Sequence, residues 1–559
     1  MKIYHYILPL FILIFLSVGA QESVLSISEP YGPYAIGFRE FNTLDKSRSF
    51  SVESDASKDK GKTISRPIQV CVWYPAVATG QTPIKYEDYF FLKAHEVGRT
   101  VLTKEGRERL IAEFIETDPV NRDVLDRELN APMKAVKNAP FEEKKRFPVL
   151  IYGPSWWSTA FENALLFEFL ASHGYVVVSS PSVGPETREM PISRISVETQ
   201  ARDMEYLLSI LDKFPNADPH KISLGGFSLG GLSNVLMMAR NRSVDAWIGL
   251  DPSIHEAYDF FKDSPYEDYR RFTKPMLFIN SLGYMNELPF YDKLVYSDAY
   301  MVNLPQLDHT DLASKFIKLF GSGDAADKIR GYNLIAKYSL AFLDGVYKYS
   351  FDYGSMMAQV FEQPSDTSFV KIKSKKGIPT VAKLFERYKN HKGEGLTAFL
   401  NDRLTSDKVV NYPEADLQDL IFRCTKSGFT ETSVRLMQWY QTSYTNTFHS
   451  KVLEHIPFDR MLQMFQMVYA NNGGCHFDYE QLNHTGHLLS MGEKGREALD
   501  YFVLNIQLNP KSYKAFFNLG IGYYRLEDFD RAAIHFKKCL ELNPDERYRD
   551  LAQGFLAKI

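Results

Sequence analysis

Short apolar runs alternate with longer segments of helical periodicity through the middle of the chain. The apolar runs are 147–152, 175–178, 246–250, 275–279 and 299–302, and segments with helical spacing include 162–172, 196–214 and 332–347. Runs this short and this apolar are typical of central strands in a parallel sheet, which are buried on both faces. Because the strands alternate with helices, the pattern predicts an α/β fold with a doubly wound, mostly parallel sheet.

The chain before this region begins the same sheet and then departs from it. Residues 31–41 have the pattern of an extended strand, and residues 67–75 alternate like a half-buried strand that stops at a proline. Residues 80–147 instead carry helical periodicity and many charges, which predicts a helical insertion over the sheet. Two interpretations stay open for this insertion: a lid, or a solvated helical excursion.

The last third of the chain is predicted to be helical. Residues 351–379 are polar and lysine-bearing, which predicts a linker or an edge of the preceding domain, and helical spacing begins near residue 380. A 34-residue unit over 513–546 resembles a tetratricopeptide repeat, and 479–512 resembles one more weakly. The positions that carry the clearer match are Tyr513, Phe516, Leu519, Gly520, Tyr523, Ala532, Phe536, Cys539 and Pro544. We therefore expect an all-α helical repeat domain over 380–559 with a concave surface for a protein or peptide partner. The alternative is a helical module that packs only on the rest of the chain or forms a dimer.

The first 20 residues have the pattern of a targeting segment. One lysine precedes a short apolar run over 10–16, and small residues at 18 and 20 fit cleavage before Gln21. This pattern predicts a signal peptide over 1–20 and an exported protein. The alternative is an uncleaved N-terminal segment that anchors the protein in a membrane, for which the apolar run is short.

The composition narrows the class of protein but does not indicate a function. The 559 residues are 45% hydrophobic and 24% charged, which is typical of a globular protein with more than one domain. A net charge of −4 gives no indication of nucleic-acid binding. The four cysteines, Cys71, Cys424, Cys475 and Cys539, form no disulfide framework, although a Cys424–Cys475 bridge is open to an exported protein.

The segment 221–231, KISLGGFSLGG, carries the strongest chemical signal in the chain. An apolar strand leads into Gly226-Phe227-Ser228-Leu229-Gly230, and a helical run follows at once. The pattern G-x-S-x-G between a strand and a helix is the nucleophile elbow of an α/β-hydrolase. The helix N-terminus behind the serine favours negative charge that develops there. This pattern predicts an α/β-hydrolase domain over residues 21–350 with Ser228 as its nucleophile. The alternative is an ordinary Gly/Ser turn.

A nucleophilic serine needs a base and an acid that holds the base. His309 follows the last predicted strand and is the expected base, although His173 and His255 also lie in range. Asp251 directly follows a strand, whereas the next strand ends in the neutral Asn280 and Ser281, with Glu287 several residues later. We therefore predict Asp251 as the acid rather than Glu287.

Several motifs together resemble the secreted platelet-activating-factor acetylhydrolase family. They are GPYAIG, RPIQVCVWYP, FLASHGYVVVS, GGFSLGG, IGLDPS, PMLFINS and DHTDLASKF, in order through residues 30–345. The resemblance implies Ser228 as nucleophile, Asp251 as acid, His309 as base, and oxyanion N–H groups at Leu229 and Trp156. The chain departs from the family in three places. The family has histidine where this chain has Phe227, and the usual His-Gly pair is missing from the Gly153-Pro154-Ser155 loop. Residues 80–147 have no counterpart in the family.

These observations predict an exported serine hydrolase that cleaves carboxylic esters without a metal or organic cofactor. The resemblance implies short acyl groups, and Trp156 and Trp157 are expected to wall off the acyl side. Phospholipids, polysaccharide acetyl esters and xenobiotic esters stay open as substrates, so a lipid-derived ester is one alternative. A peptidase or amidase shares the same residues, and a catalytically idle scaffold that serves the helical tail is the alternative from another class.

Overall fold

The chain forms two compact units, Met1–Gly377 and Ile378–Ile559. The computed structural model describes residues 23–51, 62–98, 101–117, 120–254, 258–262, 264, 266–284, 289–320, 325–349, 353–362, 367–405, 412, 414–429, 431–433, 435–436, 482–483, 486–487, 490 and 495–559. The predicted signal peptide therefore lies outside the described residues, as do His255, Glu287 and Cys475, so the Cys424–Cys475 bridge stays a prediction.

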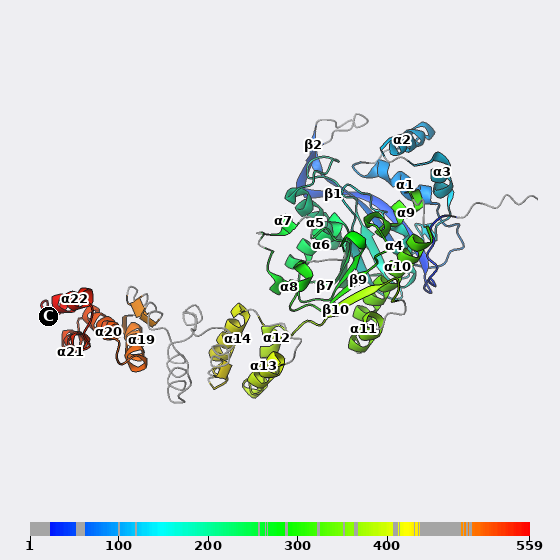
Figure 1. The fold of residues 1–559 in the computed structure, drawn as a ribbon. Coiled ribbons are helices and arrows are strands. Elements are labelled where there is room, and N and C mark those ends of the chain that lie inside the picture. The colour runs from blue at the N-terminus through cyan, green and yellow to red at the C-terminus, as the bar shows by residue number, and fades with distance from the viewer. Residues whose placement is uncertain are drawn as a thin grey trace, which may run out of the picture. The chain divides into compact units, whose positions relative to one another are not determined.

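The described residues of the first unit form one ten-stranded sheet in the order β10-β9-β8-β7-β6-β4-β5-β2-β1-β3 (Figure 1). The six strands from β9 to β5 pair in parallel: β4 (Phe147–Gly153), β5 (Val176–Ser179), β6 (Ala217–Phe227), β7 (Val244–Leu250), β8 (Met276–Asn280) and β9 (Ala299–Asn303). The hairpin of β1 (Ala35–Ser51) and β2 (Thr63–Ala76) joins this block antiparallel to β5. The prediction of a mostly parallel sheet is confirmed.

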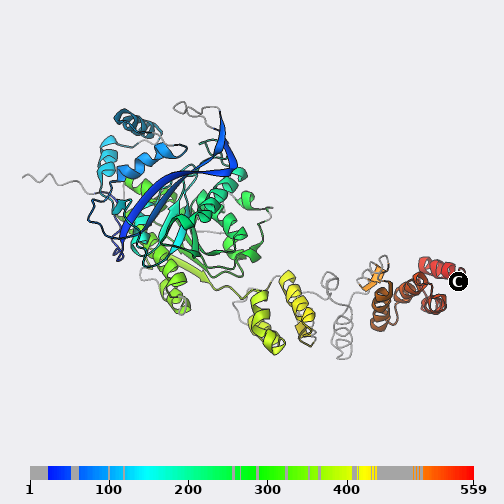
Figure 2. The same cartoon turned by 180° about the vertical axis from the view of Figure 1, so that it is seen from behind.

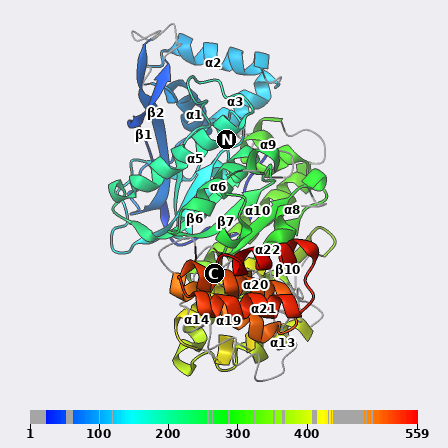
Figure 3. The ribbon, with the colours of Figure 1, turned by 90° about the vertical axis from the view of Figure 1, so that its left-hand side faces the viewer.

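Helices cover both faces of the sheet, and each face has its own apolar core. Along β4, Leu150 and Tyr152 join one core and Val149 and Ile151 join the other, as the alternation of side chains in a strand requires. The first core includes α4 (Ala164–Ser172) and α10 (Ala325–Tyr347), and the second includes α5 (Arg194–Ser209) and α6 (Leu229–Arg240). Figure 3 shows α5 and α6 side by side over the strands. Both faces being covered explains why the central strands are apolar throughout.

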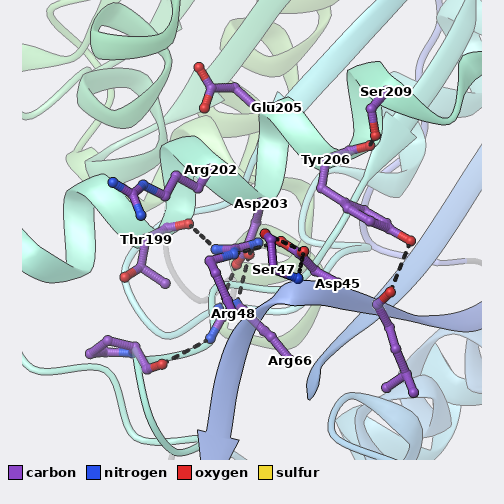
Figure 4. Close-up of polar contacts among 12 residues, drawn as sticks. Asp45, Ser47, Arg48, Arg66, Thr199, Arg202, Asp203, Glu205, Tyr206 and Ser209 are labelled. Carbon is purple, nitrogen blue, oxygen red and sulfur yellow. Dashed lines mark hydrogen bonds and ion pairs between the residues drawn. The ribbon is translucent and has the colours of Figure 1, made fainter.

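A buried ion-pair cluster fixes the β1–β2 hairpin to α5 (Figure 4). The Arg66 guanidinium donates to Asp203 through Nε at 2.8 Å and through Nη2 at 2.6 Å, and both side chains are almost fully buried. Arg48 also reaches Asp203 at 2.7 Å. Arg66 donates further to the carbonyl oxygens of Val183 and Gly184. The cluster therefore joins the hairpin, the helix and the loop that follows β5.

The insertion over 80–147 is part of the first unit's core. It contains α1 (Tyr86–Phe90), α2 (Lys104–Thr117), α3 (Arg122–Asn130) and β3 (Ala135–Lys137), and β3 pairs with β1. Its buried side chains include Tyr86, Tyr89, Phe90, Ile111, Phe114, Leu125 and Leu129. Figures 1 and 2 both show the helices beside the β1–β2 hairpin. Since these apolar residues are buried, the insertion is more than a solvated excursion.

A buried ion pair holds the insertion to the C-terminal part of the same unit. Glu128 on α3 pairs at 2.7 Å with Lys318 on α9 (Ser314–Phe320), and both side chains are at most 1% exposed. Ser23 and the backbone N–H of Val24 also donate to the Glu128 carboxylate. Burial favours the neutral carboxyl, but the contacts of Lys318, Ser23 and Val24 lower the pKa of Glu128 overall. The insertion is therefore anchored to the element that follows His309.

Residues 351–379, for which the sequence predicts a linker or an edge of the domain, contain regular structure. They hold α11 (Tyr353–Phe361) and β10 (Lys371–Lys375). β10 pairs antiparallel with β9 and forms the edge of the sheet. The lysines of β10 suit an edge strand, because charge there discourages pairing with another chain.

The second unit is helical in its described residues. Its helices are α12 (Val381–Tyr388), α13 (Leu396–Thr405), α14 (Glu414–Lys426), α19 (Gly495–Leu508), α20 (Tyr513–Arg525), α21 (Phe529–Glu541) and α22 (Glu546–Leu556). Gly520 lets α20 approach α21 closely, because a Cβ there would lie 2.7 Å from the Phe536 ring. Ala532, Phe536 and Cys539 on α21 are fully buried. The small residue Gly520 and the large residue Phe536 of the predicted repeat thus pack against each other between the two helices. None of the helices in the described part of the chain is both long and apolar enough to cross a membrane.

Candidate active site

Ser228 lies between β6 and α6 in a strained backbone conformation, with φ 53° and ψ −125°. A positive φ is unfavourable for a residue with a side chain, and such strain is concentrated at functional sites. The glycines around it are required by close contact. A Cβ on Gly230 would lie 2.0 Å from the carbonyl oxygen of Gly153, and one on Gly226 would lie 2.5 Å from the Gly230 backbone. The elbow therefore presents Ser228 at the carboxyl edge of the parallel strands.

Ser228, His309 and Asp251 form one hydrogen-bonded line. His309 Nε2 lies 3.1 Å from Ser228 Oγ, and His309 Nδ1 lies 3.0 Å from Asp251 Oδ2. Asp251 follows β7, and His309 begins the short helix η5 (His309–Leu312) after β9. The Asp251 side chain is fully buried, whereas that of His309 is about one-third exposed. The imidazole can thus exchange a proton with Ser228 while the carboxylate holds its other nitrogen.

Ser281 completes the surroundings of the Asp251 carboxylate. Its backbone N–H donates to Asp251 Oδ1 at 2.7 Å and its hydroxyl donates to Oδ2 at 2.5 Å. Burial raises the pKa of Asp251 above its usual range, and the hydrogen bonds from His309 and Ser281 offset part of that shift. In the sequence Ser281 is a neutral residue in the place of an acid, and its position directly after β8 is the signal that it lies at the same sheet edge.

Ser281→Ala is expected to lower kcat by about tenfold with little change in KM, because a hydrogen bond to a charged group contributes ~1.5–3 kcal/mol and the backbone donor remains. Ester hydrolysis kinetics measure both constants. Ser172→Ala is the matched control, since that hydroxyl is equally buried and donates to the carbonyl of Phe169, away from Asp251. Equal losses in the two variants would contradict a positioning role for Ser281.

The loop after β4 is fixed by two neighbouring buried residues, Glu162 and Asn163. The backbone N–H of Ser155 donates to the Glu162 carboxylate at 3.0 and 3.1 Å, and the Ser155 hydroxyl donates to it as well. Burial raises the pKa of Glu162, and the bonds from Ser155 act in the opposite direction. Asn163 accepts from the N–H of Ser314 at 2.8 Å and donates to the carbonyl of Leu312 at 3.2 Å. The two residues therefore join this loop to the segment that carries His309, a role that no sequence motif indicates.

The two residues expected to bind an oxyanion lie on two backbone segments that touch each other where Gly153 meets Gly230. Leu229 is the first residue of α6, where the backbone N–H has no acceptor within the helix. Trp156 lies in the loop after Gly153, whose carbonyl oxygen abuts Gly230. The backbone places Leu229 directly after Ser228, and the loop approaches the same turn from β4.

Ser253 and Phe227 also lie beside the line of Ser228 and His309. The Ser253 hydroxyl lies 3.2 Å from Ser228 Oγ, and the Ser253 backbone N–H donates to the carbonyl of Ser228. The Phe227 ring lies 4.7 Å from the imidazole of His309, centroid to centroid. His173, the other described histidine considered as a base, instead contacts the carbonyl of Pro30 through Nε2 at 3.0 Å. Within the described ranges, no three histidine, cysteine, aspartate or glutamate side chains are grouped so as to hold a metal ion.

The architecture is consistent with an α/β-hydrolase followed by helical repeats. A family model described as "Tetratricopeptide repeat" matches residues 513–546, which confirms the repeat predicted there. A UDP-N-acetylglucosamine–peptide N-acetylglucosaminyltransferase of Giardia intestinalis is 36% identical over 70 residues, which are 12% of this chain and 5% of that protein. Photosystem I assembly protein Ycf3 of Acaryochloris marina is 31% identical over 119 residues, which are 21% of this chain and 55% of that protein. The chain thus spans about half or less of the curated relatives it matches.

Among solved structures, the chain is similar to a ferulic acid esterase from Streptomyces cinnamoneus. The two are 20% identical, with a TM-score of 0.43, over 58% of this chain and 93% of the esterase chain.

Proposed function

We propose that the first unit is a serine hydrolase of the α/β-hydrolase class with a doubly wound sheet, and that it cleaves carboxylic esters. The observation that carries the proposal is the hydrogen-bonded line from Ser228 through His309 to Asp251 at a strained elbow. The resemblance to the secreted platelet-activating-factor acetylhydrolase family supports the same roles. The N-terminal pattern supports export, with anchoring by an uncleaved segment as the alternative.

In the proposed two-step reaction Ser228 is the nucleophile, His309 is the base and then the acid, and Asp251 stabilises His309. Ser228 Oγ attacks the ester carbonyl carbon while its proton passes to His309 Nε2, and Asp251 stabilises the imidazolium that forms. The N–H groups of Leu229 and Trp156 donate to the carbonyl oxygen as it becomes negative. When the carbon–oxygen bond to the alcohol breaks, His309 returns the proton to the leaving alkoxide. Water, deprotonated by His309, then attacks the acyl carbon; the bond between that carbon and Ser228 Oγ breaks, and His309 returns the proton to Ser228 as the acid leaves.

Labelling with a fluorophosphonate probe tests this proposal. The full chain is expected to react covalently, and Ser228→Ala is expected to abolish the reaction. Absence of Ser228-dependent labelling in the folded protein would favour the idle scaffold. A labelled enzyme that cleaves peptide or anilide substrates faster than esters would favour the peptidase or amidase instead.

The acyl group accepted is expected to be short, as the family resemblance implies. A series of p-nitrophenyl esters of increasing acyl length is expected to give its highest kcat/KM at the short end of the series. A maximum at long chains would contradict this expectation and favour a lipid-like acyl group.

For the second unit we propose binding of a protein or peptide partner on the concave side of its repeats. The family match over 513–546 supports this, because stacked repeats of this kind form extended binding surfaces. A chain that ends at residue 377, the boundary between the two units, is expected to keep Ser228 labelling and activity on small esters. Loss of labelling in a truncated protein that stays folded would indicate that the second unit completes the site.

A further inference from the structure

Two neighbouring tryptophans on the loop after β4 are exposed. Trp156 is 44% exposed and Trp157 is 46% exposed, although large aromatic side chains are highly buried on average. They line a cavity of about 510 Å³ together with Pro185, Met190 and Pro191. We refer to it as the tryptophan cavity. Concave sites with mostly apolar walls and a few polar groups are typical of places where small molecules bind.

The walls of the tryptophan cavity are held in place by hydrogen bonds. Trp156 Nε1 donates to the carbonyl of Met190 at 2.5 Å, which fixes the Trp156 ring against the opposite wall. The guanidinium of Arg188 lies 5.9 Å from the Trp157 ring centroid, and it is itself bound to the buried Glu96 at 2.6 Å. Because the Trp156 ring is already held by a hydrogen bond, a ligand that contacts it loses little free energy to ordering that side chain.

The same loop leads from the cavity to the elbow. The carbonyl of Pro154 accepts from Ser182 at 3.1 Å and from Gln200 at 2.7 Å, while Gly153 abuts Gly230. The tryptophans thus follow directly on a backbone segment that touches the first turn of α6. Trp156, whose backbone N–H is an expected oxyanion donor, therefore also lines the cavity.

We propose that the tryptophan cavity binds a flat aromatic ring in the alcohol part of a neutral ester. This inference rests on the proposed function, in which the acyl group is short and needs no cavity of this size, and it replaces the expectation that Trp156 and Trp157 wall off the acyl side. Two indole rings, tilted by 45° with centroids 6.2 Å apart, offer stacking and edge contacts that a flat ring satisfies and a puckered ring does not. The exposed Glu186 and Glu189 also line the cavity, and their charge disfavours a phosphate or carboxylate on the substrate.

Two acetate esters that differ only in the ring test the proposal: benzyl acetate and cyclohexylmethyl acetate. Both carry the same acyl group on a primary alcohol. The wild-type chain is expected to give a kcat/KM about fivefold higher for the benzyl ester, the size of one aromatic pair. Trp157→Leu is expected to bring the ratio to about one, and Trp157→Phe to keep most of it, because phenylalanine retains an aromatic face. A wild-type ratio of one or less, or an unchanged ratio in Trp157→Leu, would overturn the proposal.

Binding without turnover separates this inference from the proposed function. In Ser228→Ala, isothermal titration calorimetry with benzyl alcohol and with cyclohexylmethanol measures the affinity for each alcohol. Tighter binding of benzyl alcohol that is lost in Ser228→Ala/Trp157→Leu would support the aromatic site even if the wild-type chain is never labelled at Ser228. Equal binding of the two alcohols beside normal Ser228 labelling would overturn the aromatic site and leave the hydrolase proposal intact.

Discussion

Asp251→Asn is expected to lower the turnover of a short ester by about 10⁴-fold, the loss known for a triad aspartate that becomes its amide. The carboxylate accepts from His309 Nδ1 at 3.0 Å, so it selects the tautomer in which Nε2 is free to take the serine proton. An amide in its place can donate to Nδ1, which would leave Nε2 carrying the proton and facing Ser228. It also removes the charge that stabilises the imidazolium during attack.

The fold should tolerate this substitution better than the chemistry does. Burial raises the pKa of Asp251. Above the ordinary pKa of an aspartate, the buried carboxylate therefore lowers the stability of the folded chain, and a neutral amide removes this cost. Glu287→Gln is the control, because Glu287 is the other carboxylate considered for the acid, and it should cost little turnover. Steady-state kinetics beside a thermal unfolding midpoint measure both effects. A larger loss of turnover in Glu287→Gln than in Asp251→Asn would identify Glu287 as the acid.

The order of the strands made the meeting of Ser228, Asp251 and His309 foreseeable. Each residue follows a strand of one parallel block, and the carboxyl ends of such strands share an edge of the sheet. The apolar runs that predict those strands are unambiguous, because strands buried on both faces allow few polar residues. Their catalytic roles remain a proposal, but their neighbourhood follows from topology.

The parts of the site that escaped prediction act through contacts between distant segments. Ser281 holds Asp251 through one hydroxyl and one N–H, and Glu162 holds the loop at Ser155. A single serine or glutamate has no period and no motif, so only the folded chain shows its partner. The edge strand β10 was missed for a related reason, since five residues that include three lysines have the composition of a linker.

The partners of Arg66 could not be predicted from the sequence either, and its substitution gives the largest expected loss of stability. Arg66→Met is expected to lower the free energy of unfolding of the first unit by about 3–5 kcal/mol, as when one member of a buried ion pair is removed. The Asp203 carboxylate would lose its two-pronged partner, and the carbonyls of Val183 and Gly184 would lose their donors. Arg48 still reaches Asp203, which places the expected value toward the lower end of the range.

Urea unfolding followed by tryptophan fluorescence measures this loss, because Trp73 and Trp247 are fully buried in the first unit. Arg202→Met is the matched control on the same helix as Asp203: its side chain is 57% exposed and pairs with Glu198 within α5, so the expected cost is within ~0.5 kcal/mol. Arg66→Lys should fall between the two, because it keeps the charge but cannot form the paired bonds. A cost for Arg66→Met no larger than that of Arg202→Met would show that the cluster does not hold the hairpin to α5. Since Arg66 also binds the loop that continues into the tryptophan cavity, its loss should weaken the preference for benzyl acetate in whatever fraction stays folded.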